Sequence, residues 1–183
     1  MIPAPSGITL DVRNRQRLYK VNRTQLRQLA NQALLFCHCR ARSRVRRDAV
    51  RRTPTGLRAV APRPTAGNPA GVPALQSLSI VLVSDAAMAR FNRQYHATAG
   101  TTDVLSFDYG AGHGELIISV PRAVAQARQF RTTPSRELAL YVVHGILHLQ
   151  GHDDLTPGPR RRMRAAERQW LRKLDFHGLL PVR

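Results

Sequence analysis

Two histidines one helical turn apart are the residues in this chain best suited to hold a metal ion. His144 and His148 are four positions apart, so on a helix their imidazoles share one face and can reach a single ion. Gly151 follows, and glycine often ends a helix because it tolerates the left-handed conformation. The turn after it carries His152, Asp153 and Asp154. Two ligands from a helix and one from the following turn leave a coordination position open, as catalytic zinc requires.

A third ligand can come from this turn. Asp154 lies ten residues after His144, where a His-x-x-x-His-x-x-Gly-x-x-His site places its last histidine, so we favour Asp154. His152 is the alternative ligand, and Asp153 or a water molecule remains a further option. If Asp153 is not a ligand, its carboxylate can orient an imidazole from behind. We expect one Zn²⁺ ion, although two imidazoles and a carboxylate also suit other divalent transition metals.

The residue after His144 argues against a peptidase. Zinc proteases with the pattern His-Glu-x-x-His use the glutamate to activate the attacking water. This chain has Gly145 at that position, and an enzyme without its general base loses about 10²–10⁴-fold in rate. Gly145 either leaves room beside the ion for a large substrate or permits close packing of a helix on a sheet.

The charge of the chain predicts a polyanionic partner. The 183 residues include 29 Lys and Arg against 11 Asp and Glu, which gives a formal net charge of +18. Nearly all of the cations are arginines, which bind phosphate through a two-pronged fork, so we expect RNA or DNA before a membrane surface. The sequence shows neither an apolar run of the roughly 20 residues that span a membrane nor a secretory signal. We therefore expect a cytoplasmic protein.

The elements that position the histidines follow from hydrophobic periodicity. We expect strands at 8–12, 78–83, 102–107 and 115–119, and helices that begin at residues 24, 84, 121 and 134, with a last helix at about 158–174. The apolar run at 78–83 suits a buried central strand. The turn-rich link 108–114 favours an antiparallel pair, and the helix that begins at Pro134 carries both histidines.

These elements predict an α+β fold in a single domain over residues 1–183. Its small mixed four-stranded sheet is expected to pack against about five helices, in the order β-α-β-α-β-β-α-α-α. The region at about 40–73 is rich in arginine and proline and reads as an insertion or flexible loop. The last helix has one apolar face and one face rich in arginine.

Three segments of the chain resemble the YbeY family of bacterial endoribonucleases. They stand in the order of the family and cover about residues 78–174, whereas the N-terminal strand and helix fit more loosely. The segments are His144–Asp153, which is similar to the signature His-Gly-x-Leu-His-Leu-x-Gly-x-Asp, Thr102–Phe107 with Asn92 and Tyr95 before it, and Gly114–Ile118.

The resemblance implies a zincin-like fold and one zinc held by His144, His148 and the residue at position 154. It implies a cytoplasmic metal-dependent endoribonuclease that acts on single-stranded RNA. The roles it suggests are maturation of the 3′ end of 16S rRNA and ribosome quality control. The implied partners are ribosomal RNA, the small ribosomal subunit and ribosomal proteins, and we expect a monomer.

The chain departs from the family pattern at three positions. Position 154 is usually a histidine and here is Asp154, and position 152 is commonly aromatic and here is His152. The family's usual arginine after Tyr95 is replaced by His96. His96 and Arg93 are therefore our candidates for the residue that contacts the scissile phosphate or moves a proton.

Two functions of different class follow from these residues. In the first, the metal polarises the scissile phosphate and activates a water or the ribose 2′-OH, while cations stabilise the developing charge. The alternative is an RNA-binding ribosome-assembly factor with weak or no catalysis, since losing a catalytic partner can spare binding. Single-strand preference is implied by the family alone, because the sequence shows no cluster of exposed aromatics for base stacking.

Overall fold

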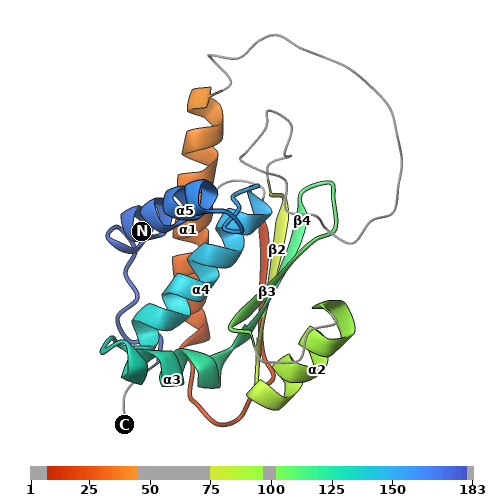
Figure 1. Ribbon diagram of the computed structural model, residues 1–183, viewed down its shortest axis with the longest axis vertical. Coiled ribbons are helices and arrows are strands. Elements are labelled where there is room, and N and C mark those ends of the chain that lie inside the picture. Colours follow the sequence, from red (N-terminus) through yellow and green to blue (C-terminus); the bar gives the residue numbers. More distant parts are fainter. Residues whose placement is uncertain (1–7, 45–74, 97–101, 181–183) are drawn as a thin grey trace.

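A computed structural model describes residues 8–44, 75–96 and 102–180 of the chain, with the side chains of 37–44 and 96 left aside. The strands in these ranges are β1 (Thr9–Asn14), β2 (Ser77–Val83), β3 (Val104–Asp108) and β4 (His113–Ser119). The helices are α1 (Arg23–Arg44), α2 (Asp85–His96), α3 (Val120–Gln129), α4 (Pro134–Leu149) and α5 (Pro157–Leu171). The predicted α+β class and the predicted order of elements are confirmed (Figure 1).

The four strands form one mixed sheet in the order β1-β2-β4-β3. β2 runs parallel to β1 and β4, whereas β3 pairs with β4 in antiparallel fashion, as the turn-rich link between them predicts. The apolar run of β2 lies between two neighbouring strands and is buried over most of its length, so the predicted central strand is confirmed. β3 is an edge strand, and this position matters for the site.

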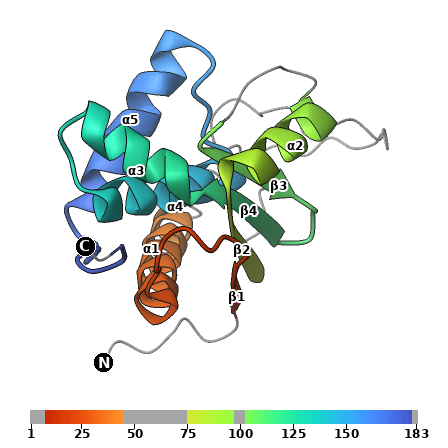
Figure 2. The ribbon, with the colours of Figure 1, turned by 90° about the horizontal axis from the view of Figure 1, so that it is seen from below.

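The helices cover the two faces of the sheet unequally. Helices α1, α4 and α5 share the larger hydrophobic core with one face, and α2 covers the other face over a smaller core around Val81, Met88 and Ile117 (Figure 2). α3 packs beside α4. α4 is therefore enclosed by the sheet, α1, α3 and α5, which explains why 11 of its 16 residues are buried.

Gly145 brings α4 unusually close to the sheet. A Cβ atom at this position would lie 2.5 Å from Leu116 Cδ2 on β4 and 3.1 Å from Ser106 Oγ on β3. The glycine therefore faces the sheet, and of its two predicted roles the structure shows close helix–sheet packing. The prediction that Gly145 leaves room for a substrate does not fit this contact.

The predicted insertion at about 40–73 falls mainly outside the described residues. Its first residues belong to α1, which continues to Arg44, so the helix is longer than the sequence pattern indicates. Residues 45–73 are not described. Among the helices of the described ranges, none has the length and apolarity needed to cross a membrane.

Candidate metal centre

The C-terminal half of α4 places His144 and His148 on the same side of the helix. The helix begins at Pro134, with Thr133 as N-cap accepting a hydrogen bond from the Arg136 N–H. It ends at Leu149, and Gly151 follows with a φ of 78°, in the left-handed region. This glycine turn reverses the chain and returns Asp154 to the histidines.

The structure brings His144, His148 and Asp154 into one group. The two histidine Nε2 atoms are 2.9 Å apart, and His148 Nε2 lies 3.8 Å from Asp154 Oδ1. One ligand atom from each residue lies within 4.8 Å of the others, and all three residues are half-buried. These are the donor types and the spacing of a mononuclear site for a borderline metal such as zinc.

Both histidine rings are oriented by a hydrogen bond at Nδ1, the ring nitrogen that does not face the other histidine. His144 Nδ1 lies 2.7 Å from Glu167 Oε1 on α5, and His148 Nδ1 lies 3.0 Å from the carbonyl oxygen of His152. Because a carboxylate and a carbonyl oxygen only accept, each ring donates its Nδ1–H. With Nδ1–H donated on both rings, the two Nε2 lone pairs face each other at 2.9 Å, which is unfavourable unless a shared proton or a metal ion lies between them. The residues present therefore fit a metal ion.

The surroundings shift the pKa values of the two histidines in opposite directions. Burial lowers the pKa of His144, but the hydrogen bond to Glu167 and its negative charge outweigh burial and raise the pKa above its usual value. Burial, followed by the charge of His144, lowers the pKa of His148. The hydrogen bond to Glu167 therefore favours the electron-rich form of the His144 ring, which increases its strength as a ligand.

The other predicted site residues lie in separate places. His152 contributes its carbonyl oxygen to His148, whereas Asp153 is buried and its Oδ1 accepts from the Leu155 N–H at 3.0 Å. Arg93 is exposed on α2. His96 is the last residue of α2, and its side chain lies outside the described part of the structure.

Glu167 is a residue that sequence reasoning missed. It is 23 positions from His144 and meets it only because α5 packs against α4. The available signal was its place on the helix, because Glu167 is the single acid of α5 and adjoins the inward-facing Met163, Ala166 and Trp170. An acid on the apolar side of a helix usually has a buried partner.

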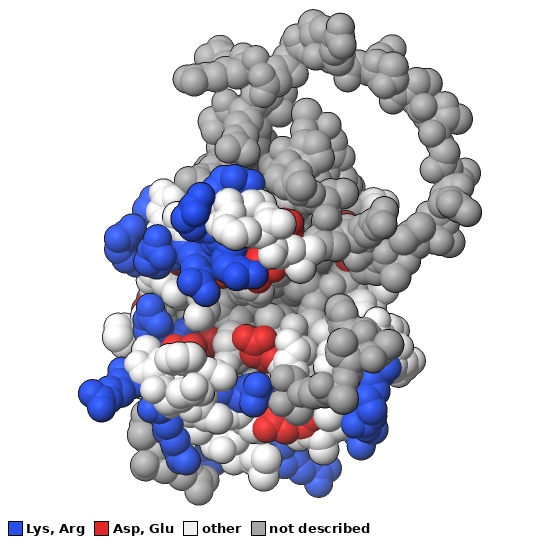
Figure 3. Space-filling view, in the orientation of Figure 1, with Lys and Arg blue, Asp and Glu red and all other residues white. Residues whose placement is uncertain are grey.

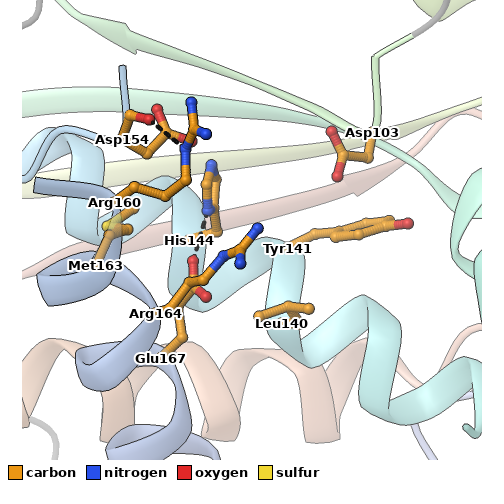
Figure 4. A pocket seen from close by; sticks show the side chains of 9 residues that line it. All are labelled: Asp103, Leu140, Tyr141, His144, Asp154, Arg160, Met163, Arg164 and Glu167. Atoms are coloured by element: carbon orange, nitrogen blue, oxygen red, sulfur yellow. Dashed lines mark hydrogen bonds and ion pairs between the residues drawn. The ribbon is translucent and has the colours of Figure 1, made fainter. Parts of the chain in front are cut away.

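A pocket of about 220 Å³ opens beside His144 and Asp154. α4 and α5 form one side, and Asp103, just before β3, lies across from them (Figure 4). Arg160 is fixed at its edge, since its Nε donates to the Asp154 carbonyl oxygen at 2.9 Å. The pocket is lined by Asp103, Leu140, Tyr141, His144, Asp154, Arg160, Met163, Arg164 and Glu167.

Four aromatic rings form a continuous row on the α2 side of the sheet, and we call them the aromatic row. Phe91 and Tyr95 lie on α2, Phe107 on β3 and Tyr109 just after it, with ring centroids 5.0–6.4 Å apart between neighbours. Tyr95 is 52% exposed and Tyr109 65%. The prediction that the chain lacks a cluster of exposed aromatics is therefore wrong, because packing of α2 beside the edge strand joins rings that are distant in sequence.

Several known proteins are similar in sequence to part of this chain. The "Endoribonuclease YbeY" of Solibacter usitatus is 42% identical over 97 residues, which are 52% of this chain and 65% of that protein. The Myxococcus xanthus protein of the same description is 40% identical over 103 residues, 51% of this chain and 35% of its own length. The Symbiobacterium thermophilum protein of the same description is 34% identical over 133 residues, which are 66% of this chain and 85% of that protein. In the first two, less than two thirds of the relative is matched.

The fold and the family are supported by two further comparisons. The solution structure of TM1509 from Thermotoga maritima superimposes with a TM-score of 0.54 at 18% identity, covering 90% of this chain and 88% of that one, and so shares the fold. The sequence profile of the family described as Endoribonuclease YbeY matches residues 64–175, which is more than half of the chain. This chain therefore belongs to the YbeY family.

Proposed function

We propose that this protein is a metal-dependent endoribonuclease that cleaves single-stranded RNA during ribosomal RNA processing. The observation that carries the proposal is the pair of Nδ1-anchored histidines whose Nε2 atoms converge with Asp154 beside a pocket. The relatives described as endoribonuclease YbeY support the reaction class.

His144, His148 and Asp154 would hold one Zn²⁺ ion, with Glu167 and the His152 carbonyl fixing the two rings. Bound zinc supplies Lewis-acid polarisation of the scissile phosphate and activation of a water or the ribose 2′-OH. The protein supplies the rest: the ring orientations are set before substrate binds, and cationic side chains at the pocket neutralise phosphate charge.

The aromatic row supports a single-stranded substrate. Exposed rings stack on unpaired bases and tolerate any sequence, whereas the bases of a duplex are already stacked on one another. Tyr95 and Tyr109 offer exposed rings beside the edge strand β3, the strand that begins next to the pocket. The net charge of +18 also favours an RNA partner, because a strongly basic protein attracts a polyanion.

The biological role that we propose follows from the family. It is maturation of the 3′ end of 16S rRNA and ribosome quality control, in the cytoplasm. The partners would be the small ribosomal subunit and ribosomal proteins, and the protein would act as a monomer.

The second candidate is an RNA-binding ribosome-assembly factor with weak or no catalysis. The observation in its favour is Asp154, which stands where the family usually has a third histidine. A carboxylate ligand lowers the charge of the site and makes a bound water less acidic. Such a site would hold its metal and bind RNA while turning it over slowly.

Turnover of a labelled single-stranded RNA separates the two functions. We expect the zinc-loaded protein to cleave it, chelator-treated protein to be inactive, and zinc to restore cleavage. His144→Ala should remove cleavage, and His113→Ala, at an exposed histidine at the start of β4, should retain it. RNA binding without turnover in any metal form would contradict the nuclease and favour the assembly factor.

A further inference from the structure

Four arginines are spaced by four residues along α5 and its C-cap, and we call them the arginine row: Arg160, Arg164, Arg168 and Arg172. Neighbouring residues at this spacing are about 40° apart around the helix axis, so the row winds slowly around the helix, and twelve residues of rise extend it over about 18 Å. Figure 3 shows Lys and Arg side chains gathered over this part of the molecule. The row therefore presents a line of positive charge rather than scattered cations.

The packing of α5 fixes where this line lies. Met163, Ala166 and Trp170 are buried and hold the inner side of the helix against the core. The N-terminal members of the row, Arg160 and Arg164, line the pocket that contains His144 (Figure 4), whereas Arg168 lies on the side of the helix that faces away from the core. The row thus begins at the candidate metal centre and runs away from it along the surface.

Arg164 differs from Arg160 in its partners. Arg160 donates to the carbonyl oxygens of Asp154 and Leu155, and so fixes the loop that carries the third candidate ligand. Arg164 is exposed, and among the described residues its guanidinium has neither a hydrogen bond nor an ion pair. Its donors are therefore available to an anion in the pocket, and a guanidinium binds two phosphate oxygens at once.

Arg93, one of the two candidates predicted from the sequence, does not occupy this place. The pocket lining within the described ranges includes no residue of α2, and Arg93 is exposed on that helix. Positive charge beside His144 comes instead from α5.

We propose that the RNA strand lies along the arginine row of α5 and that Arg164 binds the phosphate next to the candidate metal centre. The inference rests on the proposed function, because it places the substrate of that same site. Arg168 and Arg172 bind the phosphates that follow along the strand, and Arg160 keeps the Asp154 loop in position.

Binding of a fluorescein-labelled single-stranded RNA to metal-free full-length protein, followed by anisotropy across a series of salt concentrations, tests the path without turnover. Arg164→Gln and Arg168→Gln should each weaken binding and reduce the slope of log K against log salt by about 0.7, the value for one lost phosphate contact on a single strand. The weakening should be the same for RNAs of different sequence.

Arg162→Gln is the matched control. Arg162 is exposed on the same helix and carries the same charge, but two residues from Arg164 it points about 200° away around the helix axis. We expect its affinity and salt slope to equal those of the wild type. Thermal melting should be unchanged in all three variants, because each replaced side chain is exposed.

Cleavage by the zinc-loaded protein gives the second readout. Arg164→Gln should lower kcat/KM by roughly 10²-fold, the usual effect of removing one donor to a developing oxyanion. Arg168→Gln should raise KM with little change in kcat. Compared with Arg164→Gln, Arg164→Lys should recover the wild-type salt slope but only part of the wild-type kcat. This pattern separates contact with the reacting phosphate from binding of the distant strand.

Equal affinity, salt slope and kcat/KM for Arg164→Gln and Arg162→Gln, in a protein that cleaves RNA, would overturn the inference and leave the proposed function intact. A wild type that never cleaves, but binds RNA through Arg164 and Arg168 and not Arg162, would contradict the nuclease and support the path along α5.

Discussion

Asp153 and Asp154 are adjacent carboxylates with different surroundings. Asp154 Oδ1 faces His148 Nε2, whereas Asp153 is turned into the loop and accepts the Leu155 N–H. Asp154→Asn should therefore weaken zinc binding by more than the roughly 10–100-fold that loss of an outer partner causes. Asp153→Asn is the control, since its amide oxygen can still accept that N–H. Competition with a chromogenic chelator measures the zinc affinity of both variants. Equal losses of affinity in Asp154→Asn and Asp153→Asn would contradict Asp154 as the ligand.

Glu167 acts on the metal centre through His144. Glu167→Ala removes the acceptor of the Nδ1–H, so we expect zinc affinity to fall by about 10–100-fold. The same substitution should lower the pKa of His144 in metal-free protein, because Glu167 makes the largest of the contributions that raise it. Histidine NMR titration checks the sign: wild-type His144 should hold its proton to a higher pH than the variant. A higher pKa in Glu167→Ala would show that the pair does not control this ring.

At the scale of elements, the approach of α4 to β3 and β4 depends on Gly145. Gly145→Ala places a methyl group against Leu116, and such overpacking destabilises a protein by about 1–3 kcal/mol. The higher helix propensity of alanine offsets up to about 1 kcal/mol of this loss. We expect a net loss of roughly 1 kcal/mol in the free energy of unfolding, measured by urea denaturation. Gly158→Ala, where the nearest atom is 3.7 Å away, should be close to neutral. Stability gained by Gly145→Ala would argue against tight packing here.

The aromatic row belongs to the same scale, because α2 and β3 assemble it. Tyr95→Leu should weaken binding of single-stranded RNA by about 1–3 kcal/mol for the base it stacks and leave duplex RNA unaffected. Phe130→Leu is the control, since Phe130 is 61% exposed at the end of α3 and is not part of the row. Equal effects of the two substitutions on a single strand would exclude the row as a stacking surface.

Local patterns in the sequence were enough for the elements and for the pair of histidines. The i, i+4 spacing, the proline at the start of α4 and the glycine after its end predict how His144 and His148 are presented. The sequence marks Glu167 as the single acid of α5 but does not identify His144 as its partner, and it does not predict the aromatic row, because these contacts depend on how α5 and α2 pack. Arg164 was visible only as one arginine among many, and the docking of α5 is what sets it beside His144.

At the scale of the whole molecule, two surfaces suited to RNA lie on different helices around one site. Figure 1 shows α5 and α2 on either side of α4 and β3. The arginine row begins at the pocket on the α5 side, and the aromatic row borders the edge strand on the α2 side. Because α4 and α2 pack on opposite faces of the sheet, an RNA strand that contacts both surfaces would have to pass around the edge strand β3.

The central claim is that His144, His148 and Asp154 hold one metal ion, and anomalous diffraction from crystals of the zinc-loaded protein tests it most directly. We predict one anomalous peak at the zinc edge, within bonding distance of the Nε2 atoms of His144 and His148 and of a carboxylate oxygen of Asp154. A peak that contacts His152 and not Asp154 would overturn the ligand set. A protein that takes up no zinc at these residues would contradict the metal centre itself.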